Sequence, residues 1–216
     1  MQEDFWHARW QNNQIGFHER EANGQLIKFW KEIDVPENGH VFVPLCGKSL
    51  DLIWLRSQGY QVTGIEISPV AVSDFFKENN LKPTITQQGK FDRWEADGIA
   101  ILLGDFFHLS GEDLASCDAV YDRASLIALP IEMRAGYVDH CFKVLPENIP
   151  ILLITLQYQQ NDMNGPPFSV TPEEVKSHYS QQKKIAHLHS EEILHLLPGF
   201  RKKGLSELAE NIFLLT

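Results

Sequence analysis

The chain has 216 residues, of which 43% are hydrophobic and 22% charged, and this is the composition of one ordinary globular domain. The formal net charge is −10 and Lys and Arg form no long run, so no nucleic-acid partner is expected. There is no signal-peptide pattern and no apolar stretch of ~20 residues, and the three cysteines include no Cys-x-x-Cys pair, so we expect a cytoplasmic protein without a membrane partner.

Strand and helix patterns alternate along the chain. Buried strands are predicted at 40–46, 61–67, 99–103, 118–122 and 149–158, and helices at 49–58, 69–79, 131–144 and 172–179. Strands at 185–189 and 208–215, separated by a Pro198-Gly199 turn, are predicted to form an antiparallel C-terminal hairpin. This alternation predicts an α/β fold with a doubly wound, mostly parallel, Rossmann-like sheet of the seven-stranded type and helices on both faces.

The first 35 residues precede the first predicted strand and are rich in tryptophan and phenylalanine. We expect residues 1–35 to form one or two helices that cover the sheet, within a single domain spanning 1–216.

Ligands of open α/β sheets bind beyond the carboxyl ends of the strands. After the first strand, Gly47-Lys48-Ser49 resembles the end of a phosphate-binding loop, but that motif also needs glycine at position 42, which is Phe42. Pro44 removes one amide donor, and a single glycine in this segment excludes a dinucleotide fingerprint. We therefore expect a cofactor without phosphates, and a phosphotransferase that uses Gly47-Lys48-Ser49 remains an alternative function.

Glu66 ends the second strand, 19 residues after Gly47. An acidic residue about 20 residues beyond the first turn accepts hydrogen bonds from ribose hydroxyls in dinucleotide folds, and S-adenosylmethionine carries the same ribose. The alternative is that Glu66 caps the helix that begins after Ser68. Its position and spacing favour the ribose role.

Polar residues also follow the third and fourth strands. Asp105 and Phe106 could contact an adenine ring, or they could form a loop turn and a core aromatic. Arg123 carries a planar guanidinium group that suits the methionyl carboxylate of the cofactor. The alternative for Arg123 is an ordinary salt bridge with Asp122 or Glu132.

Aromatic and histidine pairs form two further candidate sites. Trp6 and Trp10 share a helical face and Phe17 follows, and aromatic faces attract cations such as a sulfonium, although core packing is the commoner role. His187 and His189 are expected on one face of a strand, but no third ligand with suitable spacing is evident. No metal is therefore expected.

Several segments together resemble the thiopurine S-methyltransferase family over essentially the whole chain. They are Pro44-Leu45-Cys46-Gly47-Lys48-Ser49, Gly64-Ile65-Glu66-Ile67-Ser68, Tyr121-Asp122-Arg123-Ala124, Gly165-Pro166-Pro167-Phe168, and Trp6-x-x-x-Trp10 followed by Gly16-Phe17-His18. The resemblance implies a class I methyltransferase fold with S-adenosyl-L-methionine as the cofactor. It implies cofactor contacts at Trp10, Leu45, Glu66 and Arg123, with Asp105 and Phe106 beside the adenine, and a substrate-facing Phe17 near the Gly165 to Phe168 loop.

The activity that the resemblance implies is methylation of sulfur on small aromatic or heterocyclic thiols such as thiopurines, with selenium and tellurium compounds as further acceptors. Such sulfur is acidic, so we expect catalysis by positioning and desolvation without a dedicated base. Arg123 could favour the anionic sulfur. The expected partner is a small-molecule thiol and the expected state is a monomer. A non-catalytic nucleoside-binding module is a second alternative.

Overall fold

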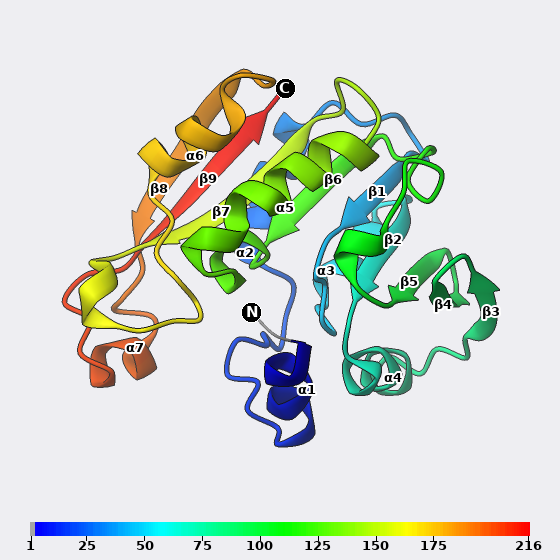
Figure 1. The fold of residues 1–216 in the computed structure, drawn as a ribbon, viewed down its shortest axis with the longest axis horizontal. Helices are drawn as coiled ribbons and strands as arrows, with labels where there is room; N and C mark the ends of the chain where they lie inside the picture. The colour runs from blue at the N-terminus through cyan, green and yellow to red at the C-terminus, as the bar shows by residue number, and fades with distance from the viewer. Residues whose placement is uncertain (1–2) are drawn as a thin grey trace.

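The computed structural model describes residues 3–216, which form one nine-stranded sheet in the order β3-β4-β5-β2-β1-β6-β7-β9-β8 (Figure 1). The strands are β1 (His40–Val43), β2 (Gln61–Glu66), β3 (Thr84–Gln88), β4 (Phe91–Ala96), β5 (Ile99–Leu103), β6 (Ala119–Arg123), β7 (Ile151–Gln157), β8 (Ile185–Glu192) and β9 (Ala209–Leu215). The central strands β5, β2, β1, β6 and β7 are parallel, and antiparallel strands flank them on both sides. The predicted α/β fold with a parallel centre and an antiparallel C-terminal pair is confirmed.

Helices cover both faces of this sheet. One face packs against α5 (Ile131–Val144) and α6 (Pro172–Tyr179), and the other against α2 (Gly24–Phe29), α3 (Asp51–Ser57) and α4 (Pro69–Glu78). Two of these helices start with proline after a hydroxyl cap, since Ser68 and Thr171 accept hydrogen bonds from backbone amides in the first turns of α4 and α6. The helix α1 (Glu3–Gln11), dark blue in Figure 1, lies at the end of the sheet near α4.

The topology reverses between β1 and β6. β1 pairs with β2 on one side and with β6 on the other, so the connections that leave these two strands diverge at their carboxyl ends. This divergence opens the crevice in which doubly wound sheets bind their ligands. The loops after β1, β2, β5 and β6 therefore frame the candidate site.

Several predicted elements differ from the structure. The hairpin of β3 and β4 was not predicted, because its strands are largely exposed and their polar residues hide the alternation. Pro198 and Gly199 do not form a turn but begin the short helix α7 (Pro198–Lys202), since proline is well tolerated in a first helical turn. β1 ends at Val43 rather than at residue 46, and residues 44–50 form a loop before α3.

A β-bulge between His187 and His189 corrects the expectation that both imidazoles share a face. The His187 ring stacks on Phe213 at 4.5 Å, whereas His189 lies 5.5 Å from the ring of Phe29 on α2. Phe213 belongs to the core beneath α5 and α6, so the two histidines face opposite sides of the sheet.

None of the helices described within residues 3–216 has the length and apolar character that a membrane span requires.

Candidate active site

The loop after β1 lies flat against β2. The backbone amide of Cys46 donates to Ile65 O at 2.9 Å, and the Cys46 side chain is buried. A Cβ atom added to Gly64 would lie 2.6 Å from Cys46 Sγ, so this close approach requires glycine. Leu45 and Gly47 both have positive φ, at 44° and 54°, which turns the loop sharply at the carboxyl end of β1. Cys46 packs beside the site, and burial raises the pKa of its thiol well above the ordinary value.

Glu66, at the end of β2, joins three loops. Its Oε2 accepts a hydrogen bond from the Gly47 amide at 2.9 Å, and its Oε1 accepts one from the Ser68 amide at 2.8 Å. Its own carbonyl accepts from the amide of Gly104, after β5. The residue is only 6% exposed, and burial raises the pKa of its carboxyl group to about 7. Helix α4 is capped by Ser68 Oγ, so Glu66 supports the helix start only through the Ser68 amide.

Lys48 turns away from this loop. Its Nζ lies 2.7 Å from Glu78 Oε1 and 3.5 Å from Asp74 Oδ2, both on α4, and the side chain is buried. The Gly47 amide is bonded to the carboxylate of Glu66, which would repel a phosphate. A phosphate-binding loop presents a backbone amide and a lysine to its ligand. Here the Gly47 amide and the Lys48 ammonium group are both bonded to carboxylates of the protein. This geometry counts against the phosphotransferase alternative.

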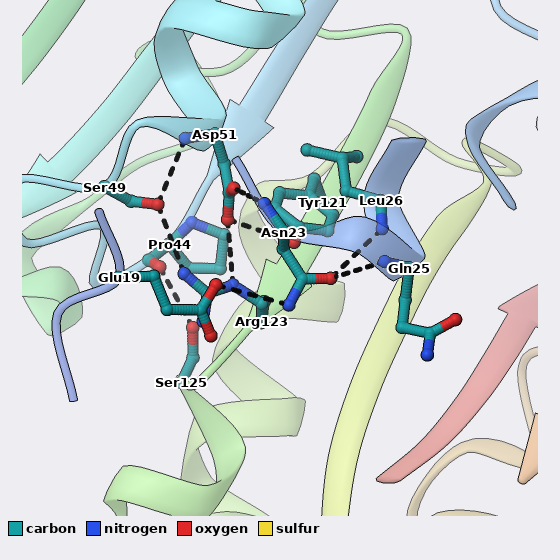
Figure 2. Close-up of polar contacts among 10 residues, drawn as sticks. All are labelled: Glu19, Asn23, Gln25, Leu26, Pro44, Ser49, Asp51, Tyr121, Arg123 and Ser125. Atoms are coloured by element: carbon teal, nitrogen blue, oxygen red, sulfur yellow. Dashed lines mark hydrogen bonds and ion pairs between the residues drawn. The ribbon is translucent and has the colours of Figure 1, made fainter. Parts of the chain in front are cut away.

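Arg123 ends β6 and connects the loop after β1 with the N-terminal segment (Figure 2). Its Nε donates to Asp51 Oδ2 at 2.8 Å, its Nη2 to Ser49 Oγ at 3.2 Å and its Nη1 to Glu19 Oε1 at 3.2 Å. A salt bridge does form, but not with the predicted Asp122 or Glu132. Asp122 points to the opposite face of the sheet, where it accepts the hydroxyl of Tyr137.

Asp51, at the start of α3, was not predicted as a site residue. It is 1% exposed and accepts hydrogen bonds from the Asn23 amide at 2.7 Å and the Tyr121 hydroxyl at 3.1 Å, in addition to Arg123 (Figure 2). Burial alone would lower the pKa of the Arg123 guanidinium, but the surrounding Tyr121, Asp51 and Glu19 raise it. The hydrogen bond to Asp51 therefore fixes the orientation of the Arg123 guanidinium.

The segment 12–23 between α1 and α2, called the strap below, carries aromatic and charged residues over the loop after β1. Trp10, which precedes the strap, is buried, and a Cβ added to Gly47 would lie 3.1 Å from its ring. Phe17 packs edge-on against Trp10 and Trp6, with ring centroids 5.5 and 5.8 Å apart. Core packing, the commoner role, describes the contacts of Trp10, and Trp10 also borders the cleft described next, so the sulfonium contact stays a prediction.

Trp10, Phe17, Leu45 and Arg123 line one cleft of about 60 Å³, together with the remaining wall residues His18, Glu19, Val43, Cys46, Gly47, Lys48, Ser49, Asp51, Tyr121 and Ala124. The structure thus brings four of the seven predicted site residues together. Glu66 adjoins this cleft through Gly47 but does not line it.

Asp105 and Phe106 lie one strand further along, after β5. Asp105 accepts the amide of Phe107 at 3.0 Å and caps a short turn. Phe106 is buried, with its ring 4.8 Å from that of Tyr137 on α5. The loop-turn and core-aromatic alternative describes their contacts in this structure, and their backbone still adjoins Glu66 through Gly104.

A parallel α/β sheet with an acidic residue at the end of β2 and a crevice at the β1–β6 reversal is the architecture of class I methyltransferases. A methyltransferase from Anabaena variabilis that depends on S-adenosylmethionine superposes with a TM-score of 0.66 at 15% identity, covering 99% of this chain and 94% of that chain. The 1,6-didemethyltoxoflavin-N1-methyltransferase of Burkholderia thailandensis, solved with S-adenosylhomocysteine, gives 0.65 at 13% identity, covering 99% and 87%. The fold is that of these enzymes.

The family follows from the sequence comparisons. The thiopurine S-methyltransferase family profile matches residues 1–216. A thiopurine S-methyltransferase of Nitrosospira multiformis is 50% identical over 215 residues, covering 100% of this chain and 98% of the relative, and one of Pseudomonas aeruginosa is 49% identical, covering 100% and 99%. The chain belongs to the thiopurine S-methyltransferase family. It is a methyltransferase, and S-adenosylmethionine is its cofactor.

Proposed function

We propose that the enzyme transfers a methyl group to the sulfur of small aromatic or heterocyclic thiols, of which thiopurines are examples. The observation that carries the proposal is that the largely covered guanidinium of Arg123, 14% exposed, and the half-exposed ring of Phe17 line one cleft. A flat aromatic acceptor packs well against such a ring, and the nearby positive charge favours the thiolate over the thiol. The names of the two relatives point to the same class of acceptor.

The donor set of the site fits S-adenosylmethionine, which supplies a methyl group on a positively charged sulfur. We assign the ribose hydroxyls to the Glu66 carboxylate, because a carboxylate at this strand end has free lone pairs beside its two amide bonds. We assign the adenine to Asp105 and Phe106, which follow the adjacent strand β5. Trp10 and Leu45 would border the methionyl part.

Arg123 is assigned to the methionyl carboxylate. In the structure Glu19 already presents a carboxylate to Arg123 Nη1 at 3.2 Å, so this edge of the guanidinium can accept such a group. The cleft of about 60 Å³ is far smaller than the ~300–1,000 Å³ typical of ligand pockets. Binding of the methionyl carboxylate would displace Glu19 from this edge of Arg123.

A defined assay tests the proposal. The protein is incubated with S-adenosylmethionine and a panel of heteroaryl thiols, alkanethiols, selenite and tellurite, and S-adenosylhomocysteine and methylated products are measured by mass spectrometry. Turnover with heteroaryl thiols is the expected result, and selenite and tellurite report on the wider acceptor range that the resemblance suggests. Binding of the cofactor without turnover of any acceptor would support the non-catalytic alternative instead.

A matched pair of variants adds a check on the acceptor position. Phe17→Ala should raise KM for an aromatic thiol several-fold with little change in cofactor affinity. Phe107→Ala is the control, because Phe107 is as exposed as Phe17, at 40% against 39%, but does not line the cleft. Equal effects of the two substitutions would contradict the assignment of Phe17 to the acceptor.

The cytoplasmic location and the monomeric state stay predictions. The first rests on three free, buried cysteines in the described chain, as reduced proteins carry them. Size-exclusion chromatography with light scattering measures the second, and a mass near 24.7 kDa is the expected result.

A further inference from the structure

Nearly every titratable side chain that lines the cleft is engaged with another protein group. Glu19, Asp51 and Tyr121 belong to the hydrogen-bonded network of Arg123, and Lys48 is paired with two carboxylates on α4. The Cys46 thiol is buried, and burial raises its pKa. His18 differs, because among residues 3–216 no side chain or backbone group forms a hydrogen bond or an ion pair with its imidazole.

The neighbours of His18 fix its position. Phe17 packs against Trp10 on one side, and Glu19 is paired with Arg123 on the other. The His18 amide donates to Ile15 O at 2.8 Å, which makes this part of the strap a turn. His18 therefore lines the same cleft as Phe17, the residue proposed to face the acceptor, and Arg123, the residue proposed to stabilise its anion.

The charges around His18 favour a neutral imidazole. Partial burial lowers its pKa below the ordinary 6.5, the positive charges of Lys48 and Arg123 lower it further, and Glu78 on α4 opposes them. Glu19, the nearest acidic residue along the strap, is itself paired with Arg123. A neutral imidazole at neutral pH can accept a proton, and the adjacent cations would then favour release of that proton to water.

We propose that His18 is the proton acceptor for thiols that are too weakly acidic to ionise by themselves, an inference that rests on the proposed S-methyltransferase function. The S–H bond of the acceptor breaks and its proton goes to an unprotonated ring nitrogen of His18. The sulfur electron pair forms a bond to the methyl carbon, and the bond from that carbon to the sulfonium sulfur breaks, leaving its electron pair on a neutral thioether. The imidazolium then loses its proton to solvent. Acidic heteroaryl thiols enter as anions and bypass His18.

The first test reads the proton itself and needs no turnover. The protein is saturated with S-adenosylhomocysteine and a weakly acidic aryl thiol, and thiolate absorbance and the NMR resonances of the His18 ring are recorded. A thiolate beside the imidazole opposes the lowering of its pKa by the two cations, so in the wild type we expect thiolate to form and His18 to move toward the imidazolium shifts. His18→Gln should shift the pKa of the bound thiol upward, whereas His195→Gln, at a histidine that is 59% exposed and outside the cleft, should leave it unchanged.

The second test is kinetic. Proton transfer by a positioned side chain typically contributes about 10²–10⁴-fold. His18→Gln should therefore lower kcat/KM at least tenfold for the least acidic thiols of an aryl series, and the loss should shrink as the acceptors become more acidic. For weakly acidic acceptors, the wild-type rate should fall as pH drops below the lowered pKa of His18, and this limb should disappear in the variant.

The outcomes separate this inference from the function on which it rests. A uniform loss across the series, or a loss matched by weaker S-adenosylmethionine binding in calorimetry, would overturn the role of His18 while S-methylation stands. An unchanged pKa of the bound thiol in His18→Gln would do the same. Absence of thiol methylation by the wild type would instead refute the proposed function.

Discussion

Replacing Arg123 with methionine should destabilise the fold as well as the site. Methionine approximates the length of the side chain but removes the charge that compensates Asp51, which is 1% exposed. Asp51 would keep only the Asn23 amide and the Tyr121 hydroxyl as donors. Removing one partner of a buried ion pair costs about 3–5 kcal/mol, a large part of the ~5–15 kcal/mol stability of a typical domain.

A double-mutant cycle in urea unfolding of the cofactor-free protein measures this coupling. Asp51→Asn alone should cost about 1–3 kcal/mol, because Arg123 keeps Glu19 and Ser49 as partners. The double variant should be more stable than Arg123→Met alone, since no uncompensated charge remains buried. Arg20→Met, at an exposed arginine of the strap, is the control and should stay within about 0.5 kcal/mol of the wild type. A cost below about 1 kcal/mol for Arg123→Met, or additive effects in the cycle, would refute the reasoning.

Three further predictions concern Glu66, Gly64 and Glu19. Burial raises the pKa of Glu66 to about 7, and the ribose would bind its ionised form, so the affinity for the cofactor should fall as pH drops through 7. Calorimetry at pH 7 should therefore detect release of a proton on binding. Glu66→Ala should cost about 1–3 kcal/mol of binding free energy and abolish that release. Gly64→Ala should lower the free energy of unfolding by about 1–3 kcal/mol through its clash with Cys46 Sγ, and Cys46→Ala in the same chain should recover part of this, as urea denaturation can show. Glu19→Gln should strengthen cofactor binding up to about five-fold in calorimetry, because it removes an exposed competitor for Arg123, and weaker binding would contradict that.

The central part of the fold could be predicted from the sequence because its strands are buried on both faces. β1, β2, β5, β6 and β7 read as short apolar runs, and each is followed by a connection with recognisable turn or helix signals. The edges could not be predicted equally well. β3 is exposed along nearly all its length, so its composition carries no hydrophobic period, and the bulge in β8 changes which residues share a face without any local sequence signal.

In the candidate site too, features that depend on nearby sequence could be predicted, and contacts between residues far apart in the chain could not. Glu66 and Arg123 could be selected because each stands at a strand end, which is a local property. The partners of Arg123 could not, since Asp51 lies 72 residues away and Glu19 lies 104 residues away along the chain. Only the packing of the strap against the β1 loop brings them together.

The hydrogen bonds and ion pairs of the loop after β1 explain why this sheet suits a nucleoside cofactor without phosphates. In phosphate-binding loops, free amides and a lysine face the ligand and attract negative charge. Here the Gly47 amide is bonded to the Glu66 carboxylate and Lys48 is paired on α4, so neither is available to an anion. A buried carboxylate stands in their place at the mouth of the sheet, and it attracts hydroxyl donors and a cationic ligand. The fragment Gly47-Lys48-Ser49 thus matches a phosphate-binding loop in sequence but not in charge. The residue that makes this loop negative is Glu66, which lies 19 residues after Gly47 and accepts its amide.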